Sequence, residues 1–226
     1  MTLDIQDAAA RFRAIPTGHI CDALEHEGIR TPVLPPSLSP ITASVHFAGP
    51  VTTLKLALCR TGKEPRRLQD LKAAVTPGSV VLIDGQGILD SVLFGDRAAT
   101  GAIRNGAVAA VVNGAVRDVD GLRELDFPVF ALSTGVPASE GRFMGVGLNV
   151  EVIIGGVLIE PGDWLVGDLS GICVIPHAMV ERVLELAEER DQIDKESIVE
   201  LKSGASFQKA HRHFRDDDPE HLRQVE

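Results

Sequence analysis

The stretch "GAVAAVVNGAVRD", residues 106–118, opens with a glycine followed by six small or branched apolar residues, 107–112. A short apolar run of this kind predicts a buried strand. The stretch then passes through a second glycine and ends in a charged pair, Arg117 and Asp118. Arg and Asp are almost never fully buried unless they are paired or bound to something. Either the strand reaches the surface here, or it presents a site.

The bulk composition is that of an ordinary globular protein, with 226 residues, 44% hydrophobic and 24% charged. This length allows a sizeable core, and because no linker divides the middle of the chain we expect a single domain over residues 1–226. The formal net charge of −10 argues against nucleic-acid binding, which needs a basic face. It also fits poorly with an anionic membrane surface, so we expect neither partner.

Targeting and redox signals favour a cytoplasmic location. The N-terminal segment is amphipathic and acidic, unlike a signal peptide, and no apolar run is long enough to span a bilayer. The three cysteines, Cys21, Cys59 and Cys173, share no metal-type spacing and lie among apolar neighbours. We therefore expect reduced, buried thiols.

The pattern along the chain predicts a strand-rich core flanked by helices. Thr17 is a candidate N-cap and Gly28 a candidate stop for an early helix. A long C-terminal helix is expected over about 178–203, followed by a polar tail over about 205–226. The other helices are predicted at the N-terminus and over 64–75, 88–106 and 118–125, with a break near Gly95 as an alternative for the second of these ranges. Strands are predicted over 41–49, 51–59, 80–84, 107–112, 127–132 and in the block 145–176.

Two segments repeat one pattern. "PGSVVLIDGQG" (77–87) and "PGDWLVGDLSG" (161–171) share Pro-Gly, an Asp seven residues after the Pro, and a Gly three residues further on. They are either two turn–strand–turn units that use the same turn chemistry, or two similar strand modules of one fold.

Asp96 and Asp118 each lie near a predicted helix start. Asp96 would begin the helix that ends at Asn105, and either residue can be explained as a helix cap. Alternatively, the amides of Arg97 and Ala98 bind a substrate carboxylate while Asp96 turns toward a metal.

Arg117 makes the functional alternative stronger. Magnesium often binds through one or two carboxylates and keeps several waters. Arg is suited to a bidentate carboxylate partner. Two helix starts with an Asp each, and an Arg beside the second, therefore predict a site for a small oxo-acid chelated on a divalent metal.

The chain resembles the 4-hydroxy-4-methyl-2-oxoglutarate aldolases and the related regulators of ribonuclease E activity. The resemblance covers roughly residues 77–176 and rests on ordered motifs: "PGSVVLIDGQG", "GDRAAT", "NGAVRDVDGLRELDFPVFA" and "GGVLIEPGDWLVGDLSGICVIP". The metal-dependent aldolases of that family carry an Asp, then Arg-Asp about twenty residues later. Asp96 and Arg117-Asp118 match this spacing.

The resemblance implies an α/β fold, a layered α-β-β-α sandwich with mixed sheets and outer helices. It implies a divalent-metal-dependent lyase (Mg²⁺, Mn²⁺ or another divalent metal) that cleaves a 4-hydroxy-2-oxo acid to pyruvate. Oxaloacetate decarboxylation is expected too, because it passes through the same pyruvate enolate. The implied roles are direct metal binding by Asp118, metal binding through water by Asp96, catalysis and substrate contact by Arg117, carboxylate binding by the amides of Arg97 and Ala98, and a site wall at Gly85, Gln86 and Gly87.

Two departures from the family pattern stand out. Arg97 occupies a position where the family usually has an apolar residue, which would make the pocket more cationic. The stretch "RTGKEPRRLQD" replaces a shorter turn, and its cations are Arg60, Lys63, Arg66 and Arg67. They either bind an acidic substrate or form a solvated surface.

The C-terminal helix carries a separate signal. Its apolar stripe, continued through a gap, places Asp191 and Asp194 on a buried-type face, where carboxylates need a partner. The resemblance implies a trimer or a dimer of trimers in which a carboxylate of this helix reaches a neighbouring subunit's metal site. Asp194, or otherwise Asp191, would take that role. Alternatively, the helix leaves its own core at this point.

Rival functions remain open. A Schiff-base aldolase would need a lysine in an apolar pocket, and Lys55 is the one candidate. The alternation of Leu54, Leu56 and Leu58, expected to point inward, places Lys55 on the opposite face. A non-catalytic regulator that binds a ribonuclease or another protein is a second rival. A different lyase or hydratase acting on a sugar-derived acid is a third.

Overall fold

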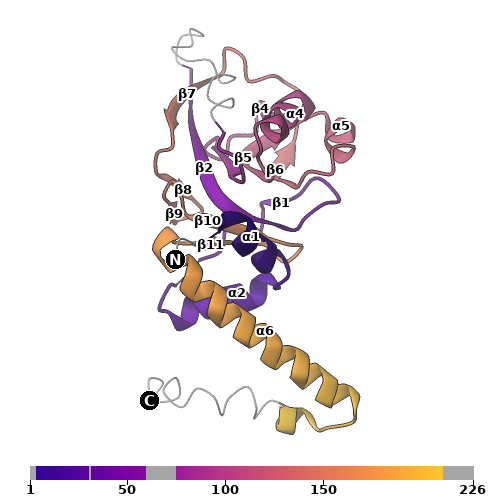
Figure 1. Ribbon diagram of the computed structural model, residues 1–226. Helices are drawn as coiled ribbons and strands as arrows, with labels where there is room; N and C mark the ends of the chain where they lie inside the picture. The colour runs from indigo at the N-terminus through magenta and orange to yellow at the C-terminus, as the bar shows by residue number, and fades with distance from the viewer. Residues whose placement is uncertain (1–3, 31, 60–74, 211–226) are drawn as a thin grey trace.

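One long strand, β2 (Phe47–Leu58), joins the two halves of the sheet in the computed structural model, which describes residues 4–30, 32–59 and 75–210. The first half of β2 pairs antiparallel with β10 (Trp164–Gly167), and the second half pairs parallel with β3 (Val80–Asp84). Figure 1 shows β2 curving between these two groups of strands. The basic stretch 60–67 and the tail beyond residue 210 lie outside the described residues, as does nearly all of the helix predicted over 64–75.

The remaining elements complete a mixed α/β arrangement. Nine strands form one curled sheet in the order β1-β6-β5-β3-β2-β10-β11, with β4 beside β5 and β7 beside β2, and β8 and β9 form a separate pair. The other strands are β1 (Ser39–Pro40), β4 (Val92–Phe94), β5 (Ala109–Val116), β6 (Val129–Thr134), β7 (Phe143–Leu148), β8 (Val152–Ile154), β9 (Val157–Ile159) and β11 (Ile172–Ile175). The helices are α1 (Ile5–Arg13), α2 (Thr17–His26), α4 (Asp96–Arg104), α5 (Val119–Arg123), the 3₁₀ helix η1 (His177–Met179) and α6 (Val180–Lys202). No helix among the described residues has the length and apolar character needed to cross a membrane.

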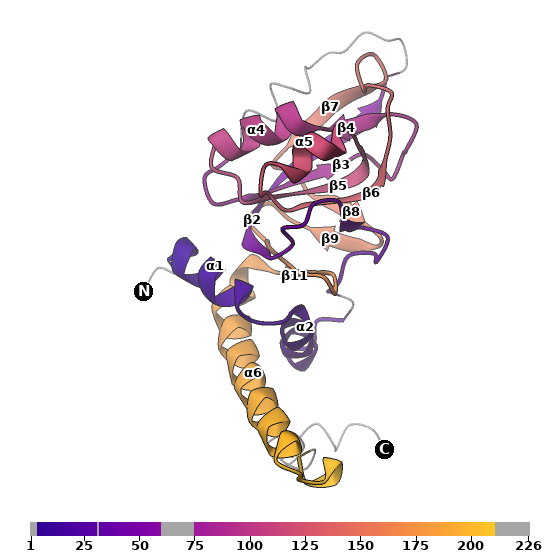
Figure 2. The same ribbon diagram turned by 90° about the vertical axis from the view of Figure 1, so that its right-hand side faces the viewer.

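The centre of the sheet is covered on both faces. Every residue of β3 and of β5 is buried. Alternate residues of these strands pack on one side with Ala99, Ala102 and Leu122 of α4 and α5. The other residues pack against strands β8 to β11. Figure 2 shows α4 and α5 together over one face, so the expected layered α/β fold with outer helices is confirmed.

Three predicted boundaries were wrong, each for a reason of packing. The helix predicted over 88–106 begins only at Asp96, directly after the break allowed near Gly95, because residues 92–94 are buried as β4 alongside β5. The strand predicted to end at 112 continues to Val116 through Gly114, where a Cβ would come within 2.6 Å of Leu93 Cδ1. The strands predicted over 41–49 and 51–59 are replaced by the single strand β2, which leaves residues 41–46 outside it. Pro50, which lacks an N–H, lies within β2 where the strand changes partner from β10 to β3.

The repeated pattern corresponds to two turn–strand–turn units. β3 and β10 follow Gly78 and Gly162, whose φ angles are +80° and +94°. At the end of each strand an Asp accepts a hydrogen bond from the backbone N–H two residues on. The distances are 2.9 Å from Gln86 to Asp84 and 2.7 Å from Ser170 to Asp168.

Asp168 also holds the start of α2, and the prediction of Thr17 as an N-cap is therefore wrong. Thr17 is the first helical residue, and its N–H and its hydroxyl donate to Asp168 at 2.9 and 2.8 Å. Burial raises the pKa of Asp168, but the hydrogen bonds from Thr17 and Ser170 outweigh it and hold the pKa below its ordinary value. Gly28, with a φ of +82°, follows the helix as expected.

The helix α6 is buried only along its first half. Val183, Leu184 and Ala187 pack with α1, α2 and β10, and the last buried residue of α6 is Asp191. Ile198, in the second half, is 41% exposed. Figures 1 and 2 show this half extending away from the rest of the molecule. The alternative that the helix leaves its own core is thus observed, and its predicted limits are confirmed to within two residues.

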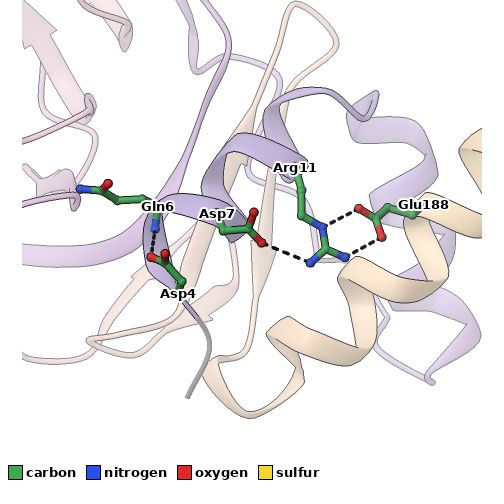
Figure 3. Close-up of polar contacts among 5 residues, drawn as sticks. All are labelled: Asp4, Gln6, Asp7, Arg11 and Glu188. Atoms are coloured by element: carbon green, nitrogen blue, oxygen red, sulfur yellow. Dashed lines mark hydrogen bonds and ion pairs between the residues drawn. The ribbon is translucent and has the colours of Figure 1, made fainter. Parts of the chain in front are cut away.

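An ion pair fastens α1 to the buried half of α6. Arg11 donates from both Nε and an Nη to the two oxygens of Glu188, each at 2.7 Å. Asp7 lies 3.5 Å from the same guanidinium, and Asp4 caps the helix by accepting from Gln6 N (Figure 3). The hydrogen bonds from Arg11 hold the pKa of Glu188 below its ordinary value.

We expect Glu188→Gln to lower the unfolding free energy by about 0.5–1 kcal/mol at neutral pH, because both side chains are well exposed and the pair is screened. Since the folded pKa of Glu188 is depressed, this contribution is present above its unfolded pKa and is lost as the pH falls below about 4. Urea denaturation of both proteins at several pH values checks this. A difference that persists at acid pH would contradict it.

Candidate functional site

Three parallel strands end at one edge of the sheet and deliver polar residues there. β3 ends at Asp84, β4 leads into Asp96, and β5 leads into Arg117 and Asp118. Ligands of open α/β sheets bind outside the carboxyl ends of such strands. β5 is buried throughout, whereas the next two residues are exposed, so the strand reaches the surface at this edge.

Asp118 has an unusual backbone conformation. It occupies the N-cap position of α5, but its φ of 56° and ψ of 42° are left-handed, and its side chain makes no capping hydrogen bond. The explanation of Asp118 as a simple cap is therefore not what the structure shows. A left-handed residue other than Gly costs roughly 1–2 kcal/mol, and Asp and Asn tolerate it best. Such strain is concentrated at functional sites.

Two glycines bring the acidic side chains together. A Cβ on Gly95 would lie 2.7 Å from Asp118 Oδ2, and a Cβ on Gly121 would lie 3.0 Å from Asp96 Oδ2. Each carboxylate thus rests on a glycine at the beginning of the other helix. The carboxylates of Asp96 and Asp118 therefore each lie close to the start of the other helix.

Asp96 and the two predicted amides are already hydrogen-bonded. Asp96 is the first residue of α4, and its Oδ1 accepts from the N–H of Arg97 at 2.5 Å. The N–H of Ala98 donates to Gly95 O at 3.0 Å. A substrate carboxylate could use the Arg97 amide only after Asp96 turns away from it.

Arg117 lies beside Asp118 with much of its side chain in solvent. Its Nε donates to Asp118 Oδ2 at 3.2 Å, and the two side chains are 45% and 41% exposed. An exposed pair of this kind contributes little to stability. The other guanidinium N–H groups can therefore bind an acidic ligand without a large loss of stability.

The loop 85–87 lies at the same edge. Gln86 has a φ of 57°, and its side-chain amide donates to Leu56 O on β2 at 3.0 Å. The N–H groups of Gly85 and Gly87 donate to Asn113 O at 3.0 and 3.2 Å. The sequence pointed to this loop but not to the buried Asp84 and Asn113 that hold it. Two polar residues inside otherwise apolar strands were the signal that could have found them.

The donor set at Asp96 and Asp118 fits a hard divalent cation. In the described part of the chain no three His, Cys, Asp or Glu side chains are grouped to hold a metal ion. Two carboxylates with access to water are nevertheless the protein contribution that Mg²⁺ commonly uses.

The two carboxylates of α6 lie elsewhere. Asp191 is buried and paired with Lys195, and its Oδ1 is 3.4 Å from His19 Nδ1. Asp194 Oδ2 is 3.7 Å from His19 Nε2. Both views place α6 at the opposite end of the molecule from α4 and α5 (Figures 1 and 2). The partners of Asp191 and Asp194 are thus His19 and Lys195 of the same chain. Neither carboxylate lies near Asp96 of its own chain.

Lys55 does not lie in an apolar pocket. Its Nζ is 3.5 Å from Glu151 O at the surface, while Leu54 and Leu56 are buried on the opposite face. Leu58, predicted to point inward, is 49% exposed at the end of β2. Among the cysteines only Cys173 is fully buried, and Cys21 and Cys59 are partly exposed.

Comparison with known proteins shows the family to which this chain belongs. Residues 17–174 match the family described as RraA-like: Aldolase/RraA. A protein of Halalkalibacterium halodurans named "Putative 4-hydroxy-4-methyl-2-oxoglutarate aldolase" is 34% identical over 189 residues, covering 84% of this chain and 86% of that protein. A Burkholderia mallei protein of the same name is 37% identical over 171 residues, covering 73% of this chain and 98% of that protein.

Solved structures share the fold. Streptomyces coelicolor RraAS2, described as an unusual member of the RNase ES inhibitor RraA protein family, has a TM-score of 0.78 at 25% identity and covers 85% of this chain and 97% of its own. An uncharacterized protein from Pseudomonas syringae has a TM-score of 0.80 at 24% identity, covering 93% of this chain and 100% of its own. The second likeness shows the fold alone.

The left-handed backbone at Asp118 predicts an order of stability among its variants. We expect Asp118→Asn and Asp118→Gly to match or exceed the wild-type unfolding free energy, and Asp118→Ala to lose about 1 kcal/mol. Urea denaturation measures the series. The Asp118 side chain makes no capping hydrogen bond, so the backbone conformation alone should separate the Ala variant from the Gly variant. Equal unfolding free energies for these two variants would contradict this account.

Proposed function

Since this chain belongs to the RraA-like family, we propose that it is a divalent-metal-dependent lyase that cleaves small 4-hydroxy-2-oxo acids, of the 4-hydroxy-4-methyl-2-oxoglutarate type, to pyruvate. The observation that carries this proposal is the convergence of Asp96 and Asp118 on each other's helix starts, with Arg117 alongside. Relatives named as aldolases supply the reaction class.

Asp118 would hold the metal directly and Asp96 would hold it through water. The left-handed turn at Asp118 and the absence of a Cβ at Gly95 give that carboxylate its place. A divalent cation held by these residues, such as Mg²⁺ or Mn²⁺, would supply Lewis-acid stabilisation of negative charge on the 2-oxo group.

Arg117 would bind the oxo-acid end of the substrate through paired N–H groups, which suits a planar carboxylate. If Asp96 turns toward the metal, it releases the N–H of Arg97, which together with the Ala98 amide lies at the positive end of α4. Oxaloacetate fits the same arrangement, because loss of CO₂ from it also yields the pyruvate enolate.

A regulatory function is the second candidate. It is favoured by the likeness to RraAS2, a relative whose family is described as RNase ES inhibitors. A regulator needs no intact metal pair. Turnover that depends on a divalent metal is therefore the property that separates the two candidates.

We further propose a homotrimer or a dimer of trimers in which α6 of one subunit lies near the site of the next. The second half of α6 extends from its own subunit, and Ile198 and Val199 on it are exposed. Asp194 would then leave His19 to join a neighbour's metal site. Light scattering at micromolar concentration would test the assembly.

We expect Asp118→Asn to lose metal-dependent turnover by about a hundredfold or more, because it removes the charge of a direct ligand while keeping the backbone and the volume. Pyruvate release from oxaloacetate and from 4-hydroxy-4-methyl-2-oxoglutarate, with Mg²⁺ and with EDTA, measures this. Asp120→Asn, at an exposed neighbour on α5, is the matched control. Normal turnover by Asp118→Asn, or turnover that EDTA does not affect, would rule out the metal-ligand role.

Arg117→Lys should lower kcat and raise KM in the same assay, because Lys lacks the planar fork. Its stability should stay within about 0.5 kcal/mol of wild type, as is usual for exposed positions. Arg104→Lys, an exposed substitution at the end of α4, serves as the control. Near-normal kinetics for Arg117→Lys would mean that Arg117 is only a surface residue.

A further inference from the structure

A buried polar pair links the carboxyl ends of β3 and β5. Asp84 and Asn113 are 5% and 9% exposed and stand directly opposite one another in the parallel ladder. Asn113 Nδ2 donates to Asp84 Oδ1 at 2.9 Å. Among the described residues Asp84 forms no ion pair. A carboxylate buried in this way is costly unless hydrogen bonds satisfy it, so the pair requires an explanation.

The pair binds every backbone N–H group of the loop 85–87. The N–H of Gln86 donates to Asp84 Oδ1 at 2.9 Å. The N–H groups of Gly85 and Gly87 both donate to the backbone oxygen of Asn113. The loop backbone therefore has no donor of its own left free, and its position is set by two residues of the sheet.

The loop also needs this support. Gln86 is in the left-handed region, with a φ of 57°. This conformation is unfavourable for a residue with a Cβ and persists only where the surroundings impose it. The hydrogen bond that the N–H of Gln86 donates to Asp84 Oδ1 acts at the strained residue itself.

The same structural unit carries the proposed site. Asn113 precedes Arg117 by four residues on β5. A Cβ on Gly85 would lie 2.1 Å from Leu93 Cδ1, and a Cβ on Gly114 would lie 2.6 Å from the same atom. The loop and β5 therefore both pack on Leu93, which precedes Asp96 by three residues. A shift of the loop would therefore change its place relative to Arg117 and Asp96.

We propose that Asp84 and Asn113 are positioning residues, which fix the loop 85–87 as a wall of the substrate site. This inference rests on the proposed function. The hydrogen bonds, and not the negative charge of Asp84, perform the role, because both bonds to Asp84 end on one oxygen. An amide oxygen at residue 84 could accept both.

The chain contains its own control. Asp168 closes the equivalent turn after β10 by accepting from Ser170 N, and its carboxylate also accepts two hydrogen bonds from Thr17 of α2. Substituting Asp168 thus removes the same kind of turn contact on the β10–β11 side of the molecule, away from the strand ends that carry Arg117.

The test compares Asp84→Ala, Asp84→Asn, Asn113→Ala and Asp168→Ala with wild type. Calorimetry gives the Kd of oxalate, a planar analogue of the pyruvate enolate, in the presence of Mg²⁺. Oxaloacetate decarboxylation gives kcat and KM, and thermal melting gives Tm. Asn113→Ala keeps the backbone oxygen that binds Gly85 and Gly87, so it remains informative if Asp84→Ala does not fold.

We expect Asp84→Ala to raise the Kd of oxalate and the KM about tenfold, as misplacement of a site wall does. Asn113→Ala should raise them less, and Asp84→Asn should leave both within about twofold of wild type. Asp168→Ala should lower Tm without changing Kd.

Three results would overturn the inference alone: a wild-type Kd in Asp84→Ala, an Asp84→Asn variant as impaired as Asp84→Ala, or an equal rise in Kd for Asp168→Ala. A wild-type protein that neither binds oxalate with Mg²⁺ nor decarboxylates oxaloacetate would overturn the proposed function, and this inference with it.

Discussion

The complete burial of β5 is the constraint on which the rest of the structure depends. A strand with no exposed residue must be covered on both faces, which here requires α4 and α5 on one side and strands β8 to β11 on the other. It must also have strands on both edges, and β3, β4 and β6 provide them in parallel. Parallel pairing then brings the ends of β3, β4 and β5 to one edge, where the polar residues gather.

At that edge the acidic side chains are arranged by the close approach of the backbone at two glycines, and not by electrostatic attraction. Asp96 and Asp118 carry like charges, and nothing in their mutual electrostatics favours their meeting. Gly95 and Gly121 allow it by leaving room for each carboxylate beside the opposite helix. The strained backbone of Asp118 and its solvent-exposed pair with Arg117 belong to the same arrangement, and neither adds much to local stability.

The sequence predicted those features that depend on local pattern. The apolar runs gave β3 and β5, and the spacing of Asp96, Arg117 and Asp118 gave the acidic edge. It did not predict β4, because an apolar run as short as residues 92–94 cannot be told from part of a helix by periodicity, and the pairing with β5 decides it. It misassigned Thr17, whose partner Asp168 lies 151 residues away in the chain. It also missed Asp84 and Asn113, since a polar residue inside an apolar strand shows its purpose only once its neighbour across the sheet is known.

The partial burial of α6 has a consequence for its motions. Up to Asp191 the helix shares the core of α1, α2 and β10, so its amides can open only when that core opens. Beyond it no residue of the helix is fully buried, and its side-chain contacts include that of Asp194 with His19 of α2 and that between Gln192 and Glu196 within the helix. Isolated helical segments of this length are marginal in water. In a separate subunit, amide hydrogen exchange should therefore speed up steeply along a single continuous helix, and any partner that covers the second half would abolish the gradient.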